Sequence, residues 1–216
     1  MTIPGKLSLL STCVYLAFSS ASQSYAACDN YLPGTGQTVE CDVSAPNPDP
    51  TAIVSASGVK GVTVNIAPGS EHNVAGAEAI SLGDGSNIIN AGQLTGTTGV
   101  LLREGTSVLN NSGAITGTTG PGAQFNGSGN NQLTNSGTIQ GSAGSQAVVF
   151  GSGNDVLIMN GGTITGDVDS GDGADSANIS NGTITGTLLQ GNGIDDFFMS
   201  GGSLGALQQG DNRDTF

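Results

Sequence analysis

The sequence contains no tryptophan, one histidine and only four basic residues among 216. Because 17 acidic side chains outnumber those four, nucleic acid and anionic lipid are poor partners, and we expect no nucleic-acid function. A Ser-His-Asp triad would depend on the single His72. Aromatic residues make up 4% of the chain, so any core must be thin and aliphatic. The sequence carries no dinucleotide-binding fingerprint, P-loop or Cys/His metal cluster.

The start of the chain has the three parts of a secretory signal peptide. One lysine precedes a mostly apolar run from Leu7 to Phe18, and small residues precede a cleavage point between Ala26 and Ala27. The run has about 12 residues, fewer than the roughly 20 that span a bilayer as a helix. We therefore predict that residues 1–26 are removed on export. An uncleaved anchor and a lipoprotein signal ending at Cys28 are the alternatives.

Residues 27–60 are predicted to form an N-terminal cap. Cleavage removes Cys13 and leaves Cys28 and Cys41, whose simplest state in an exported protein is a disulfide; two free thiols are the alternative. Such a bond would close a short loop and contribute about 3 kcal/mol. The run Pro46-Asn-Pro-Asp-Pro50 follows, where strand pairing is difficult because proline lacks the amide donor.

Residues 61–216 repeat one phrase: Asn or Ser, any residue, Gly, any residue, then Ile or Leu. Successive regular copies are separated by 21, 24, 25, 20 and 20 residues, without helical periodicity. A period near 20 predicts an all-β fold, a right-handed parallel β-helix (β-solenoid) in which each coil buries its apolar face by stacking on its neighbours. About nine such coils would fit in the 190 residues left after cleavage of residues 1–26. The phrase stops within a coil at Phe216, so we expect the repeats to be incomplete at the C-terminus.

Equivalent positions of stacked coils form columns about 4.8 Å apart. We predict an aliphatic interior column, a glycine column that marks the adjacent bend, and a short stack of Phe125 on Phe150. A further column is expected to hold Asn87, Asn131 and three aspartates. The aliphatic column consists of Leu94, Ile115, Ile139, Ile164, Ile184 and Leu204, and the glycine column of Gly92, Gly113, Gly137, Gly162, Gly182 and Gly202.

The aspartates end a second phrase, Gly-x-Gly-x-Asp, at Asp155, Asp175 and Asp195. Neighbouring charges in one column would repel by roughly 3.5 kcal/mol at an effective dielectric constant of 20. The carboxylates must therefore turn into solvent, accept N–H bonds from the turns or share a hard cation. The phrase resembles the calcium-binding nonapeptide of repeats-in-toxin proteins, but it returns every 20 residues. We expect turn capping without metal or cofactor; Ca²⁺ on these three aspartates is the alternative.

No catalytic residue is expected. Ser203 lies in a Gly-x-Ser-x-Gly pattern, but it occupies the place of a threonine in earlier coils and is not an elbow between strand and helix. The neighbouring Asp195 and Asp196 are of the kind that polysaccharide-cleaving β-helices use. Those enzymes also need a basic or aromatic groove, and only Lys60 and Arg103 are available upstream of the last residues.

Four features belong together: the signal peptide, the loop from Cys28 to Cys41, the alternating strand Val62-Thr-Val-Asn-Ile66 and the Asn-x-Gly-x-Ile coils. They resemble the N-terminal passenger region of the type V autotransporters of Gram-negative bacteria. The resemblance implies export through the periplasm to the cell surface at the outer membrane, or release outside the cell. It also implies passage through a C-terminal outer-membrane β-barrel. No such domain is present in this sequence, so the missing barrel is the first expected partner.

The predicted function is that of a surface-exposed, structural or adhesin-like passenger without enzymatic activity. Its exterior, rich in Thr, Asn and Ser, suits a glycan or host-surface ligand, or contact with another copy of itself. Two alternatives remain. One is a calcium-binding secreted module of the repeats-in-toxin kind, and the other is a polysaccharide-active β-helix enzyme.

Overall fold

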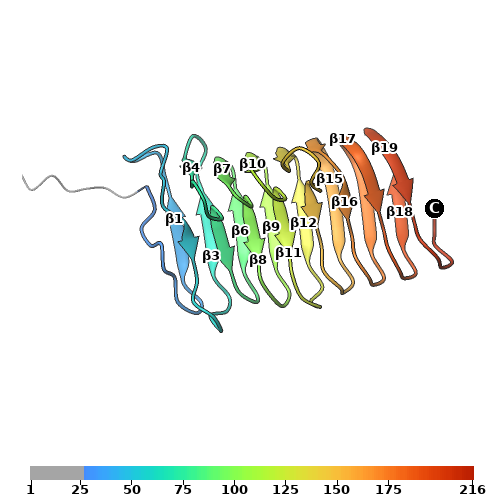
Figure 1. The fold of residues 1–216 in the computed structure, drawn as a ribbon, viewed down its shortest axis with the longest axis horizontal. Helices are drawn as coiled ribbons and strands as arrows, with labels where there is room; N and C mark the ends of the chain where they lie inside the picture. The colour runs from blue at the N-terminus through green and yellow to red at the C-terminus, as the bar shows by residue number, and fades with distance from the viewer. Residues whose placement is uncertain (1–26) are drawn as a thin grey trace, which may run out of the picture.

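The computed structural model describes residues 27–216, so the predicted signal peptide, including Ala26, lies outside the described residues. The regular secondary structure of these residues consists of strands, without a helix. The strands form one parallel β-solenoid of about eight turns with about 22 residues each. The predicted all-β solenoid is confirmed. Figure 1 shows the coils side by side along a rod, from the N-terminal coils at one end to the C-terminal coils at the other. Within residues 27–216 no helix is long and apolar enough to cross a membrane.

The rod has three faces, and each strand pairs in parallel with its equivalent in the next coil. The first face holds β1 (Thr38–Cys41), β3 (Thr63–Ile66), β6 (Asn87–Asn90), β9 (Val108–Asn111), β12 (Gln132–Asn135) and β18 (Asp196–Met199). The second holds β4 (Glu71–Asn73), β7 (Gln93–Gly96), β10 (Ala114–Gly117) and β13 (Thr138–Gln140). The third holds β2 (Ile53–Val54), β5 (Ile80–Leu82), β8 (Val100–Leu102), β11 (Ala123–Phe125), β14 (Val148–Val149) and β16 (Val168–Asp169).

Three long strands continue around the corners of the rod. Strand β15 (Val156–Thr165) serves the first and second faces, β17 (Ser176–Leu189) serves all three, and β19 (Ser203–Gln208) serves the second and third. Strands β1 and β2, which lie in the segment predicted as a cap, already stack in register on β3 and β5. The coils therefore begin within that segment.

Alternation of side chains fills the interior of the rod. In β3, Val64 and Ile66 point inward and are buried, while Thr63 and Asn65 face outward. The same rule builds the predicted aliphatic column, because the register joins Leu94 to Ile115 and continues in steps of one coil to Leu204. That column is confirmed.

The glycine column lies at a close approach of successive coils. A Cβ at Gly113 would overlap the carbonyl oxygen of Gly92, and one at Gly137 would overlap that of Gly113. The predicted aromatic stack is also confirmed: the rings of Phe125 and Phe150 lie 4.7 Å apart at 15°. Both features follow from coils that repeat at the strand spacing.

One register prediction is wrong. Asn87 does not share the column of Asn131, because it pairs with Val108, which pairs with Gln132. The inward position before β6 belongs to Ser86, which is 1% exposed. The turn before β6, Gly83-Asp-Gly-Ser-Asn87, has the same form as Gly127-Ser-Gly-Asn-Asn131 before β12. However, β6 begins at the last residue of its phrase and β12 begins one residue after the phrase, so the phrase does not fix the register to the residue.

An asparagine ladder, formed by Asn90, Asn111 and Asn135, runs through the interior beside the first corner. The Asn90 amide donates to Oδ1 of Asn111, and the Asn111 amide donates to Oδ1 of Asn135, both at 2.8 Å. Met159 follows in the same column, and Asn160 is exposed beyond it. The pairing of β15 with β17 shifts register at this point, so Asn160 is not equivalent to the three earlier asparagines.

Candidate functional site

The aspartates of the Gly-x-Gly-x-Asp turns form an interior ladder, which we call the aspartate ladder. Each of its three members, Asp155, Asp175 and Asp195, is the residue immediately before a first-face strand: β15, β17 and β18 respectively. The backbone N–H of Asp155 donates to Oδ1 of Asp175 at 2.8 Å, and that of Asp175 donates to Oδ1 of Asp195 at the same distance. Asn131 precedes the ladder, with its backbone N–H 2.6 Å from Oδ1 of Asp155, and Asp214 follows it. Backbone donors thus hold one oxygen of each carboxylate.

The second oxygen of each carboxylate is buried without a hydrogen-bond partner. This is true of Oδ2 in Asp155, Asp175 and Asp195, whose residues are 0–2% exposed. Burial raises the pKa of all three carboxyls, and raises that of Asp175 to about 7. The ladder therefore favours neutral carboxyls even though each group accepts an N–H bond.

The ladder does not gather its carboxylates around one point. Within residues 27–216, one group of three metal-ligating residues has ligand atoms within 4.8 Å of one another, and it is Cys28, Cys41 and His72. The three calcium candidates are instead stacked one per coil.

Sequence analysis identified these aspartates but did not place Gln190 beside them. Its side chain is buried, donates to the Asp196 carbonyl oxygen at 3.2 Å and leaves Oε1 without a partner.

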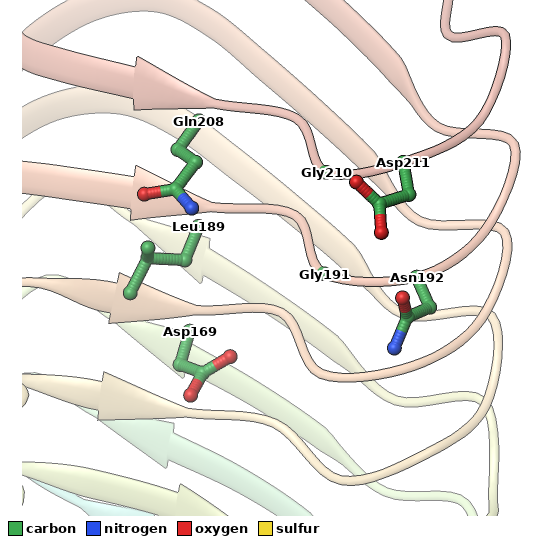
Figure 2. A pocket seen from close by; sticks show the side chains of 7 residues that line it. All are labelled: Asp169, Leu189, Gly191, Asn192, Gln208, Gly210 and Asp211. Carbon is green, nitrogen blue, oxygen red and sulfur yellow. The ribbon is translucent and has the colours of Figure 1, made fainter.

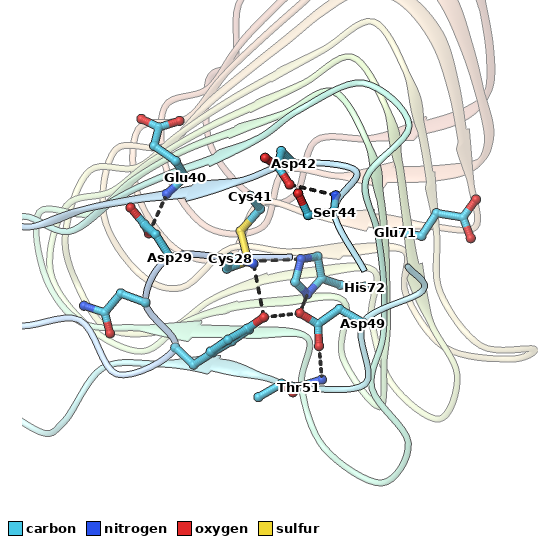
Figure 3. The surroundings of a disulfide bond; sticks show 12 residues. Cys28, Asp29, Glu40, Cys41, Asp42, Ser44, Asp49, Thr51, Glu71 and His72 are labelled. Carbon is cyan, nitrogen blue, oxygen red and sulfur yellow. Dashed lines mark hydrogen bonds and ion pairs between the residues drawn. A yellow bond between two sulfur atoms is a disulfide. The ribbon is translucent and has the colours of Figure 1, made fainter. Parts of the chain in front are cut away.

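A polar cluster lies at the other end of the rod, around the disulfide between Cys28 and Cys41 (Figure 3). Nε2 of His72 lies 3.1 Å from Sγ of Cys28, and Nδ1 of His72 lies 4.0 Å from Oδ2 of Asp49. The Tyr31 hydroxyl donates to the same Asp49 oxygen. The Thr51 N–H donates to its other oxygen at 2.8 Å. This group ties the segment before β1, the end of β1 and strand β4 together.

Burial controls the protonation of this cluster. It lowers the pKa of His72, so the imidazole is neutral at physiological pH. Burial and the hydrogen bond to Asp49 raise the pKa of Tyr31 to about 12. Sequence analysis missed Tyr31 and Asp49, which carry no motif. His72 had one available signal, because it lies 22 residues before Leu94, one coil length upstream in the same interior column.

The residues weighed for catalysis lie apart from one another. His72 and the strand of Ser203 are separated by six coil steps, about 29 Å at the strand spacing. Asp195 is buried, whereas Asp196 faces outward on the next position of the chain. These two carboxylates therefore do not flank a common substrate position.

The two upstream basic residues make contacts within the rod. Lys60 pairs with Asp84 at 2.9 Å. The Arg103 guanidinium donates to the carbonyl oxygen of Ser55 at 2.6 Å and to its hydroxyl at 2.9 Å. Lys60 thus connects neighbouring coils, whereas Arg103 reaches across two coil steps, so each cation already has a partner within the rod.

A shallow hollow lies beside the last coils, with a volume of about 350 Å³. Figure 2 shows Asp169, Leu189 and Gln208 one above another on successive coils, with the turns at Asn192 and Asp211 next to them. Its lining includes no basic side chain and only one large apolar one. The hollow thus offers acceptors and amides but no group suited to an anionic ligand.

The second face of the rod carries two outward columns of small polar side chains, which we call the threonine face. Glu71 is its one charged member, and Ala114 its one apolar member. The first column is Glu71, Gln93, Ala114, Thr138, Thr163, Thr183 and Ser203, and the second is Asn73, Thr95, Thr116, Gln140 and Thr165. Hydroxyl and amide groups therefore repeat along the rod about every 4.8 Å.

No family of proteins, curated protein or solved structure gives a significant match to this chain.

Proposed function

We propose that this chain is an exported, surface-exposed passenger of the autotransporter kind, structural or adhesin-like and without enzymatic activity. The observation that carries the proposal is the threonine face, an extended array of uncharged donors and acceptors on a rigid support. Such a face suits many weak contacts repeated along a glycan, a host surface or a second copy of the chain. Residues 1–26 supply the export signal, and a C-terminal β-barrel is the partner that would carry the rod across the outer membrane.

The composition of the face favours a neutral, hydroxylated ligand. Thr138, Thr163 and Thr183 stack on adjacent coils and offer both donors and acceptors. Their strands are held by backbone pairing on both sides, so binding requires no ordering of the main chain. A polysaccharide with repeating hydroxyls would meet the same chemistry at every coil. We therefore name a neutral glycan as the leading ligand class.

The carboxylates support an enzymatic alternative less well. A retaining or inverting glycosidase needs two carboxyl groups that flank one glycosidic bond. The neighbouring Asp195 and Asp196 point to opposite sides of their strand. The calcium alternative has one favourable observation, the buried and unpartnered Oδ2 atoms of the aspartate ladder.

Export is tested first, with the full chain produced in Gram-negative cells. We expect a periplasmic product that begins at Ala27, which N-terminal sequencing of the purified protein would show. Replacing Ala26 with an arginine should block cleavage. A cytoplasmic product that still begins at Met1 would contradict the exported location.

Binding is tested on an immobilised glycan array with a triple variant, Thr138→Val, Thr163→Val and Thr183→Val. Valine keeps the branched shape and the strand preference of threonine but removes the hydroxyl. The matched control is Thr63→Val with Thr134→Val, two outward threonines on the first face. We expect the triple variant to lose glycan binding at least tenfold and the control to retain it. Equal binding by both variants, or none by the parent chain, would contradict a glycan role for this face.

A further inference from the structure

Three metal-ligating side chains converge at the disulfide end of the rod. The ligand atoms of Cys28, Cys41 and His72 all lie within 4.8 Å of one another, and each residue is at most 2% exposed. The nitrogen Nε2 of His72 faces the sulfur of Cys28 at 3.1 Å (Figure 3). Two sulfurs and one imidazole are a ligand set that Zn²⁺ and Co²⁺ favour.

On its far side the imidazole faces a carboxylate, although Nδ1 has no hydrogen-bond partner there. Nδ1 of His72 lies 4.0 Å from Oδ2 of Asp49, and Tyr31 donates to that same oxygen. A carboxylate on this side favours the proton on Nδ1 and leaves the Nε2 lone pair directed at the sulfurs. Metal-binding histidines commonly donate their second N–H to such a carboxylate, so Asp49 would have to move closer to Nδ1 when the metal binds.

We propose that Cys28, Cys41 and His72 form a redox-selected metal site, a disulfide when oxidised and a Zn²⁺ site when reduced. A dithiol reductant supplies two electrons and two protons, breaks the S–S bond and becomes a cyclic disulfide. The two cysteines are then thiols. Zn²⁺ displaces both thiol protons to solvent and takes the two thiolates and the Nε2 lone pair as ligands.

The geometry needs only local movement. Tetrahedral Zn²⁺ with sulfur at about 2.3 Å and nitrogen at about 2.0 Å places the two sulfurs about 3.8 Å apart and each about 3.5 Å from the nitrogen. The observed distance of 3.1 Å between Cys28 Sγ and His72 Nε2 is close to that value. Once the S–S bond is broken, the sulfurs can separate, and water fills the fourth position. The two states exclude each other because a disulfide sulfur is a poor ligand and a thiolate is a good one.

Either state would join the same three segments of the rod. The ligands come from Cys28 in the segment that precedes β1, from the last residue of β1 and from the middle of β4 in the next coil. A chain whose cysteines are still reduced would thus hold its first coils together through the metal. This inference is independent of the proposed function, because it concerns the end of the rod opposite the aspartate ladder and not the threonine face.

Titration with Co²⁺ tests the site in the full chain, with Cys13→Ser in every sample so that Cys28 and Cys41 are its only cysteines. With a phosphine reductant present, we expect one Co²⁺ per chain, thiolate-to-cobalt charge-transfer absorption and the visible bands of a tetrahedral ion. Zn²⁺ should displace the cobalt. The oxidised chain should show none of these bands.

Variants separate the site from the fold. His72→Leu, which matches Leu94 in the same column, should weaken Co²⁺ binding at least tenfold, and His72→Gln serves as a second variant of different packing. Asp49→Asn should weaken it by about 10- to 100-fold. Glu71→Gln, on the outer side of the same strand, should bind like the parent.

Four results would overturn the proposal. They are no charge-transfer band in the reduced parent, unchanged affinity in both His72 variants, equal binding by the oxidised chain, and binding that appears only when the β-type circular dichroism is lost.

Discussion

The backbone N–H of Asp155 donates to Oδ1 of Asp175 at 2.8 Å across the gap between two coils. Asp175 is thus held by one oxygen while its other oxygen is buried without a partner. Burial, together with the charges of Asp155, Asp195 and Asp169, raises its pKa to about 7. A carboxyl that ionises in this position is desolvated and surrounded by like charges. The ladder therefore couples the stability of the C-terminal coils to pH.

We predict that the ladder makes the rod less stable at pH 8 than at pH 5. The pKa of Asp175 is raised in the folded state, so its favourable contribution is complete below the reference value of 3.8 and is lost as pH rises through about 7. Asp155 and Asp195 shift in the same direction. Urea unfolding at constant ionic strength between pH 5 and pH 8 measures the effect.

Asp175→Asn isolates this contribution. Asparagine keeps an Oδ1 acceptor for the Asp155 N–H but cannot ionise, and Asn131 already occupies an equivalent place in the column. We expect the variant to be more stable than the parent at pH 8 by about 1–4 kcal/mol, since each pKa unit corresponds to about 1.4 kcal/mol. The difference should shrink at pH 5. Asp211→Asn, an exposed change in the last coil, is the control. An unchanged pH slope in Asp175→Asn would contradict the coupling.

Calcium is expected to leave the stability of the rod unchanged. Backbone N–H groups already bind one oxygen of each ladder carboxylate, and the three carboxylates do not converge on one point. Thermal unfolding at pH 7.5 with millimolar Ca²⁺ or with EGTA checks this. A higher melting temperature in Ca²⁺ that disappears in Asp175→Asn and Asp195→Asn would instead support the calcium-binding module.

Much of the interior was predictable because each coil repeats its own chemistry. The aliphatic column from Leu94 to Leu204 and the stack of Phe125 on Phe150 follow from side-chain type and period alone. The register of individual residues between coils was harder to predict from the sequence. Ser86 replaces Asn87 inside the rod, because β6 begins one residue earlier relative to its Gly-x-Gly turn than β12 does. A one-residue error exchanges the inner and outer faces of a strand.

The cluster around the disulfide was predictable only in part. Two cysteines in a chain that is predicted to be exported indicate a disulfide, but Asp49 and Tyr31 belong to a segment without periodicity. Their approach to His72 depends on how that segment folds over the first coil. The isolated pairing of Asp49 with His72 is a tertiary contact that no local pattern records.

The glycine column lies at a close approach of the coils, and we predict that Gly113→Ala is strongly destabilising. Its Cβ would overlap the Gly92 carbonyl oxygen, and backbone on both coils would have to move. We expect a loss of about 1–3 kcal/mol. Gly161→Ala is the matched control, because its Cβ would meet nothing closer than 3.8 Å. Chemical denaturation compares the two, and equal losses would show that close approach is not the cause.

The asparagine ladder should be the most sensitive polar element of the interior. Asn111→Ala removes the acceptor of the Asn90 amide and the donor to Asn135, both of which are buried. This leaves Oδ1 of Asn135 without its donor and the Asn90 amide with only its longer contacts to the carbonyl oxygens of Gly92 and Ala114, so we expect a loss of about 1–3 kcal/mol. Asn110→Ala, the outward neighbour in the same strand, should change the free energy of unfolding by less than about 0.5 kcal/mol. Urea unfolding of the two variants at one pH measures the contrast. If Asn111→Ala were as mild as Asn110→Ala, the coils would be held by their aliphatic column and backbone pairing alone, and the ladder would serve only to fix register.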